Sequence, residues 1–219
     1  LQQMVNEARG SLSKADKDAV SKLELAIQNP ANKKMSYQSI ISFWDSLKHP
    51  AIAAYYMEQA ANESPNDTNW EQAGNRYFAS TRFARESEKQ LLYNHAIECF
   101  EKTLLFNPKN TEAKINLGAS YVEGSTNPMK GIGLLREVEK TDSNNINLQL
   151  NFAFFSEKSG QWEKAIKRFE KVLKINPNFS EAYLDLADAY QQMGNKQKAI
   201  ESLQSYIGKV DDAGIKTEI

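Results

Sequence analysis

The chain has 219 residues, of which 41% are hydrophobic, so it is long enough to bury one large core or two small ones. Its 27 Lys and Arg residues balance 28 Asp and Glu residues at a net charge of −1, which lacks the basic surplus of a nucleic-acid-binding surface. The single cysteine, Cys99, excludes an internal disulfide framework and a metal site built from several cysteines.

The first predicted element is an amphipathic helix near residues 15–28. Apolar side chains recur along it at helical spacing. They are Val20, Leu23, Ala26 and Ile27. We assign residues 1–33 to an N-terminal helical segment that packs on the first of the repeats that follow.

A pattern of alanine, aromatic and proline residues then recurs along the chain. An alanine is followed by an aromatic residue four positions later and by a proline eight positions after that. The copies are Ala96, Phe100 and Pro108, and Ala165, Phe169 and Pro177. Ala199 opens a further copy 34 residues after Ala165, and a fixed period of this size is typical of stacked helical repeats.

A second pattern precedes these copies, in which an aromatic residue, a pair of small or apolar residues and a tyrosine share one helical face. The clearest cases are Tyr183, Leu186, Ala187 and Tyr190, and Trp70, Ala73, Gly74 and Tyr77. Together the two patterns predict an all-α fold of stacked antiparallel helix pairs, in which small residues let the paired helices approach closely. The predicted pairs span residues 34–66, 67–110, 111–145, 146–179 and 180–213, and a C-terminal stub, 214–219, follows them.

Prolines and hydroxyl residues predict where these helices end and begin. Pro108 and Pro177 should close second helices, because proline cannot continue a helix and restricts the residue before it. Hydroxyl side chains that cap free backbone N–H groups mark the starts of first helices. The predicted caps are Thr68, Thr111 and Ser180, and Glu71 would complete a capping box with the first of them.

The second predicted pair is longer than the period allows. Its excess, Arg82–Leu91, is charged, favours helix and contains neither Gly nor Pro. We expect the excess to lengthen both helices of the pair into a protruding arm. Such an arm would contact a partner or a second copy of the chain, or it would be an elongation that binds nothing.

The repeats carry a family resemblance. Over residues 34–213, the period and the two patterns resemble those of tetratricopeptide-repeat proteins. The resemblance implies a right-handed superhelical solenoid with a concave groove that is lined by the first helix of each pair. It also implies that this groove binds peptides or partner proteins.

A finer resemblance concerns the location of the protein. Tyr121 and Val122, followed by residues 127–138, resemble a stretch of bacterial tetratricopeptide proteins that carry an N-terminal membrane anchor. The chain begins at Leu1 instead of Met, and no apolar stretch within it reaches the roughly 18 to 20 residues that cross a bilayer. We therefore expect an anchor upstream of Leu1 and a place in the cell envelope; without that anchor, a cytoplasmic location is expected.

The sequence offers no catalytic constellation. His49 and His95 are its two histidines, and no His, Cys, Asp or Glu cluster has the spacing of metal ligands. Gly131 and Gly133 begin like a dinucleotide-binding motif, but the third glycine and the preceding strand are missing. We predict no enzyme activity, no metal and no cofactor.

The predicted function is a protein-interaction scaffold, because stacked repeats generate an extended concave surface. A glycan- or small-ligand-binding envelope protein is one alternative, and its sign would be exposed aromatic side chains clustered at one end of the stack. A spacer that associates with its own copy as a homodimer is another. No motif in the chain identifies the protein or peptide partner.

The predicted groove is lined by first-helix residues that interleave with the repeat signature. They are Phe78, Ile115, Ala119, Val122, Leu150, Phe154, Leu184 and Asp188. A mostly apolar set argues against the capture of a free C-terminal carboxylate, for which such grooves use Lys, Arg and Asn. It suits an amphipathic helix or an extended hydrophobic segment, with Phe154 as the anchor. Alternatively, Leu150 and Leu184 only pack between neighbouring first helices.

Overall fold

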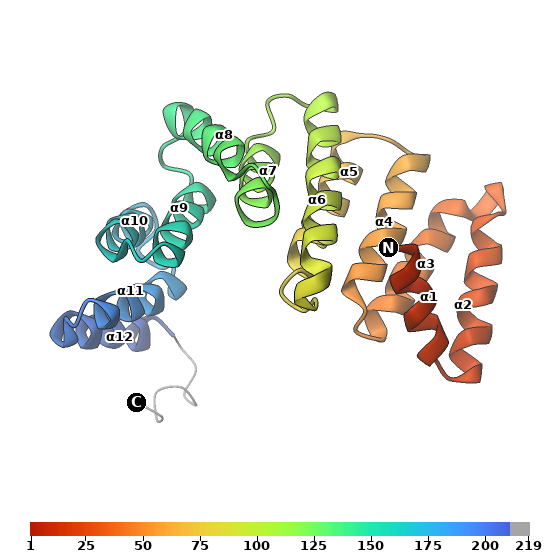
Figure 1. Cartoon of the computed structure of the whole chain (residues 1–219), viewed down its shortest axis with the longest axis horizontal. Coiled ribbons are helices and arrows are strands. Elements are labelled where there is room, and N and C mark those ends of the chain that lie inside the picture. Colours follow the sequence, from red (N-terminus) through yellow and green to blue (C-terminus); the bar gives the residue numbers. More distant parts are fainter. Residues whose placement is uncertain (211–219) are drawn as a thin grey trace. The chain divides into compact units, whose positions relative to one another are not determined.

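A computed structural model describes residues 1–210, and the predicted C-terminal stub lies outside this range. Over the described residues the chain is all-helical, with twelve α-helices, one short 3-10 helix and no strand. Consecutive helices pack in antiparallel pairs (Figure 1), which confirms the predicted fold class. The chain divides into two compact units, Leu1–Leu135 and a second that begins at Arg136, and each is described by itself. None of the described helices is long and apolar enough to cross a membrane.

Unit 1 holds the N-terminal helices and the first helix pairs. In chain order the elements are α1 (Gln2–Ser11), α2 (Lys14–Ile27), η1 (Pro30–Asn32), α3 (Lys33–Ser46), α4 (Pro50–Glu63), α5 (Asp67–Ser80), α6 (Glu86–Phe106), α7 (Thr111–Gly124) and α8 (Pro128–Thr141), the last of which continues past the boundary between the units. The sequence predicted α2 but not α1. The helix α1 carries the apolar residues Met4, Val5 and Ala8 at helical spacing, but only Val5 among them is buried.

The core of unit 1 consists of two clusters of buried side chains. In the first, Val20 of α2 packs with Ile40 and Trp44 of α3, so the N-terminal helices share a core with the first pair. In the second, the buried residues of α5 and α6 include Tyr77 and Phe100. Burial of apolar area of this kind is the main favourable contribution to folding.

Glycine is required where the paired helices come closest. A Cβ atom added at Gly74 of α5 would lie 2.8 Å from the ring of Phe100, which is fully buried on α6. A Cβ atom added at Gly118 of α7 would lie 2.9 Å from the Leu135 side chain of α8. The small residues of the sequence pattern therefore mark the contacts between the helices of a pair.

Unit 2 repeats this arrangement. Its complete helices are α9 (Ile146–Lys158), α10 (Trp162–Ile175), α11 (Glu181–Gln192) and α12 (Lys196–Lys209). Ala153 of α9, Phe169 of α10 and Leu186 of α11 belong to one buried cluster. The helix α10 ends at Ile175, two residues before Pro177, as α6 ends two residues before Pro108.

At α5 and α7 the side-chain caps differ from the predicted ones, because asparagine rather than a hydroxyl residue supplies them. The side chain of Asn66 accepts a hydrogen bond from the backbone N–H of Asn69 at 2.8 Å, so Thr68 is not a cap. Asn110 caps α7 in the same way, and Thr111 is the first residue of that helix. No side-chain cap forms at Ser180. The predicted capping box is therefore wrong, and Glu71 instead accepts a hydrogen bond from the side chain of Asn110.

The predicted arm also takes a different form. Only the second helix of the pair is lengthened, since α6 has 21 residues whereas α5 has 14 and ends at Ser80. A turn follows, in which Phe83 is 80% exposed, and α6 then begins at Glu86. The side chain of Arg85 pairs with Glu88 at this start, which favours a new helix over continuation of α5.

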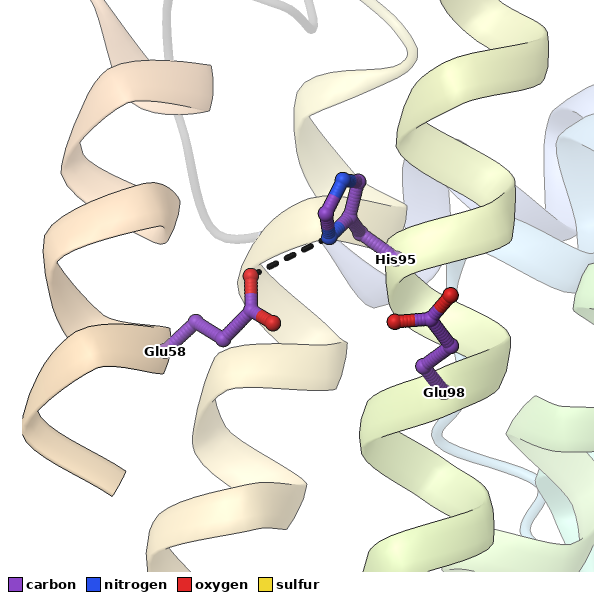
Figure 2. Close-up of side chains that lie close together, drawn as sticks. All are labelled: Glu58, His95 and Glu98. Carbon is purple, nitrogen blue, oxygen red and sulfur yellow. Dashed lines mark hydrogen bonds and ion pairs between the residues drawn. The ribbon is translucent and has the colours of Figure 1, made fainter. Parts of the chain in front are cut away.

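A buried carboxylate joins three helices of unit 1. Glu58 of α4 is 7% exposed and accepts a hydrogen bond from the Tyr77 hydroxyl of α5 at 2.6 Å. It also accepts one from His95 Nδ1 of α6 at 3.1 Å (Figure 2). Burial raises the pKa of the Glu58 carboxyl, but the hydrogen bonds from His95 and Tyr77 outweigh burial and hold this pKa below its ordinary value. The charged Glu58 carboxylate therefore links α4 to α5 and α6 through hydrogen bonds.

We expect Gly74→Ala to destabilise the chain. The added methyl group would collide with the buried Phe100 ring, and overpacking of this kind costs about 1–3 kcal/mol. The matched control is Gly133→Ala in α8, where a Cβ atom meets nothing within 4 Å and alanine should stabilise the helix by about 0.5–1 kcal/mol. Urea denaturation followed by circular dichroism measures both. Equal loss of stability in the two variants would contradict the close-contact role of Gly74.

We expect Glu58→Ala to lower the free energy of unfolding by about 1–3 kcal/mol, because the buried Tyr77 hydroxyl would lose its acceptor. Glu58→Gln keeps an acceptor oxygen and should lose less. Urea denaturation at neutral pH compares the two variants with the unmutated chain. If alanine and glutamine have the same small effect, the hydrogen bonds of Glu58 do not stabilise unit 1.

Candidate partner-binding surface

Four of the predicted groove residues lie in unit 1, and only two of them are accessible. Phe78 and Val122 are half-buried, and the Phe78 ring packs edge-on against Tyr93 at 5.8 Å between ring centroids. Ile115 and Ala119 are 0% and 1% exposed, so these two do not line an open surface. Their prediction was wrong because α7 is buried around most of its circumference, whereas the sequence analysis assumed one free face.

The other four predicted residues lie in unit 2, on α9 and α11. Phe154 is 40% exposed, Leu184 is 38% exposed and Asp188 is exposed, whereas Leu150 packs partly buried against the core. Phe154 follows Leu150 by one helical turn, and Asp188 follows Leu184 by one turn, so each pair shares a helix face. We call the surface formed by these two helix faces the α9/α11 face.

Acidic side chains belong to the same face. Glu157 lies three residues after Phe154 on α9, and Asp185 and Glu181 flank Leu184 at spacings of one and three residues on α11. The acidic residues of the two helices are close enough to act on one another electrostatically, since Asp185 and Asp188 both raise the pKa of Glu157. The α9/α11 face therefore combines apolar side chains with a group of carboxyls.

Two of these carboxyls are strongly perturbed. Burial, followed by the charges of Asp185 and Asp188, raises the pKa of Glu157 to about 7. Burial, followed by the charges of Asp188 and Glu181, raises the pKa of Asp185 to about 6. Desolvation and like charges both disfavour an ionised carboxylate, so the two causes act in the same direction.

Within residues 136–210, no basic side chain forms an ion pair with Glu157 or Asp185. No basic group is among the main causes of either pKa shift, and a nearby cation would have lowered these pKa values. Elsewhere in the same unit acidic groups do have partners: Arg168 pairs with Glu139, and the Tyr190 hydroxyl donates to Glu170. Perturbed and uncompensated carboxyls of this kind occur preferentially at functional sites.

Unit 1 contains a hollow that the sequence analysis missed. It has a volume of about 700 Å³ and lies between α3, α4 and α5, with Tyr37, Gln38, Asn69 and Gln72 in its lining. Lys33 also lines it and pairs with Glu63, so its charge is compensated. None of the predicted groove residues lines this hollow.

The carboxylate contact described above includes residue types that bind metal ions. Glu98 lies one turn after His95 on α6, and its carboxylate, the His95 ring and Glu58 offer ligand atoms within 4.8 Å of one another (Figure 2). Imidazole nitrogen and carboxylate oxygen are ligands for zinc. However, His95 and Tyr77 already donate to the same Glu58 oxygen, which accounts for the cluster as a contact between helices.

This cluster was missed for a physical reason. Glu58 and His95 are 37 residues apart and meet only because α4 and α6 both pack against α5. The sequence signal was limited to the spacing of His95 and Glu98 on one helix. The raised pKa values of Glu157 and Asp185 could not be predicted from the sequence for the same reason, since they depend on how α9 and α11 pack.

Comparisons with known proteins agree with this architecture. A family model described as tetratricopeptide repeat matches residues 156–216. A tetratricopeptide repeat protein from Parabacteroides merdae is 15% identical over 94% of this chain and 81% of its own, with a TM-score of 0.62. MamA from Desulfovibrio magneticus RS-1 is 16% identical over 84% of this chain and 96% of its own, with a TM-score of 0.55. A search of curated proteins gives no match.

A further crystal structure of MamA is 20% identical, covers 78% of this chain and 94% of its own, and has a TM-score of 0.54. Identities of this size show a shared fold and nothing finer. The repeat period, the consecutive helix pairs and the match of residues 156–216 point to one conclusion. The chain is a protein of the tetratricopeptide-repeat fold.

Proposed function

We propose that the chain is a non-catalytic scaffold that binds a helical or extended segment of another protein on the α9/α11 face of unit 2. The observation that carries the proposal is the exposure of Phe154 and Leu184, two large apolar side chains, on first helices of the repeat fold. Burial of such side chains against a partner removes apolar surface from water, which is the main driving force of protein association. In this proposal α10 and α12 support the face and α9 and α11 contact the partner.

Phe154 has the properties of an anchor. Its ring packs edge-to-face on the fully buried Phe169 ring, at 5.7 Å between centroids and an interplanar angle of 68°. This contact holds the ring in place before a partner arrives, so binding costs little additional side-chain entropy. Rigid aromatic side chains that are partly buried in the free protein dominate the energy of many interfaces.

The position of exposed aromatic residues in unit 1 disfavours the glycan-binding alternative. Phe83 is 80% exposed in the turn before α6, and Phe106 is 54% exposed at the last residue of α6. The two are separated by the length of a 21-residue helix, so they do not gather at one end of this unit. A protein partner therefore suits the described surface better than a sugar ring stacked on clustered aromatics.

We expect peptides selected for binding to the chain from a display library to depend on Phe154. Phe154→Glu should weaken these peptides at least about tenfold, because an anchor of this kind contributes about 2 kcal/mol or more. Leu184→Glu should also weaken them, and it disturbs no ring contact. The matched control is Ile200→Glu on α12, which replaces a side chain that is 49% exposed outside the proposed face. Fluorescence anisotropy measures the affinities, and circular dichroism checks that each variant is folded.

Peptides that bind the folded Phe154→Glu and Leu184→Glu variants as tightly as the unmutated chain would place the binding site elsewhere. The hollow between α3, α4 and α5 would then be the next surface to test. Loss of binding in Ile200→Glu alone would show that α12 contacts the peptide. A Phe154→Glu variant that is monomeric in solution, where the unmutated chain is a dimer, would instead indicate that the face joins two copies of the chain.

A further inference from the structure

The α9/α11 face carries negative charge next to its apolar side chains. Glu157 lies beside Phe154 on one helix surface, and Asp185 and Asp188 lie beside Leu184 on the other. Glu157 and Asp185 are only partly exposed, so their charges are incompletely screened by solvent. On α9 the acidic Glu157 follows the apolar Leu150 and Phe154, and on α11 the apolar Leu184 lies among acidic residues.

We propose that the occupant of the α9/α11 face is a basic amphipathic segment of a partner protein, whose apolar side chains contact Phe154 and Leu184 while its Lys or Arg side chains pair with Glu157, Asp185 and Asp188. This inference rests on the proposed function and adds the chemistry of the partner. Its basis is charge complementarity. An acidic partner would add negative charge to a face on which no described basic side chain pairs with Glu157 or Asp185, whereas a basic partner supplies positive charge there.

The partial burial of Glu157 and Asp185 strengthens the preference for a basic partner over a neutral or acidic one. A charge pair on a fully hydrated surface contributes little, but a pair that is screened less by solvent contributes more. The free face is held in an unfavourable state, because burial and mutual repulsion both oppose ionisation of Glu157 and Asp185. A cation placed among the three carboxylates removes that repulsion, and an uncharged apolar partner leaves it unchanged.

The proposal carries a pH dependence with a definite sign. The charged groups that act on Glu157 are Asp185 and Asp188 of α11, and those that act on Asp185 are Asp188 and Glu181; no cation of α9, α10 or α12 is among them. Lys and Arg side chains of the partner pair with ionised carboxylates, so binding favours the loss of protons from the Glu157 and Asp185 carboxyls. Affinity should therefore be highest at about pH 8 and fall as the pH decreases through about 7 and then about 6, where the two carboxyls take up protons.

Three designed helical peptides test the proposal. Each has about 18 residues and the same stripe of leucines, and the polar face consists of Lys, Gln or Glu. Their affinities for the whole chain are measured by fluorescence anisotropy in about 150 mM salt, which screens long-range attraction. We expect the Lys peptide to bind at least about tenfold more tightly than the Gln peptide at pH 8, and the Glu peptide to bind most weakly.

Two triple variants separate the site from general charge. Glu157→Gln, Asp185→Asn and Asp188→Asn together should remove most of the preference for the Lys peptide over the Gln peptide and abolish its pH dependence. The matched control removes the same number of charges from α10 and α12. It combines Glu163→Gln, Glu170→Gln and Glu201→Gln, all of which are exposed. This control should keep both the preference for the Lys peptide and the pH dependence.

The outcomes distinguish the two proposals. If the Lys and Gln peptides bind equally well and both depend on Phe154, the face binds apolar segments without selecting charge, and the inference is overturned while the proposed function stands. If both triple variants weaken the Lys peptide equally, the preference is general charge attraction, which also overturns the inference. If none of the peptides binds, or if binding ignores Phe154→Glu, the proposed function fails as well.

Discussion

Two antiparallel helices share a core only where a small residue lets their backbones approach, and the structure depends on this constraint. At Gly74 and Gly118 the space for a side chain is already occupied by Phe100 and Leu135 of the partner helix. Contacts of this kind use one face of each helix. Where the neighbouring helices leave the other face of a first helix uncovered, as on α9 and α11, side chains such as Phe154 remain available to a partner.

The α9/α11 face of unit 2 also carries carboxyls in an unfavourable electrostatic environment. A lysine beside Glu157 or Asp185 would bring the pKa of that carboxyl closer to its ordinary value and would stabilise the folded chain at neutral pH. An arrangement that opposes ionisation of both groups lowers the stability of the folded chain above the pH at which the unfolded carboxyls ionise. Proteins retain such local conflicts mainly at functional sites, where a ligand relieves them.

The sequence predicted what depends on local pattern. The alanine, aromatic and proline spacings gave the helix pairs, because side-chain size and backbone restriction act within a few residues. It did not predict what depends on competition between similar residues or on packing. Asn66 caps α5 in preference to Thr68. Arg85 is the N-cap of α6, inside residues 82–91, which were expected to lengthen both helices of the pair. The burial of Ile115 and the meeting of Glu58 with His95 require neighbours that lie far away in the sequence.

We propose that a basic partner neutralises the acidic carboxyls of the α9/α11 face. Carbon-detected NMR titration of the Glu157 carboxyl, with and without the Lys peptide, tests it most directly. We expect a pKa of about 7 in the free chain, because burial and the neighbouring acids oppose ionisation, and a clear decrease when the peptide binds. A pKa near the ordinary value of 4.5 in the free chain, or one that the peptide leaves unchanged, would show that a basic partner does not neutralise this carboxyl.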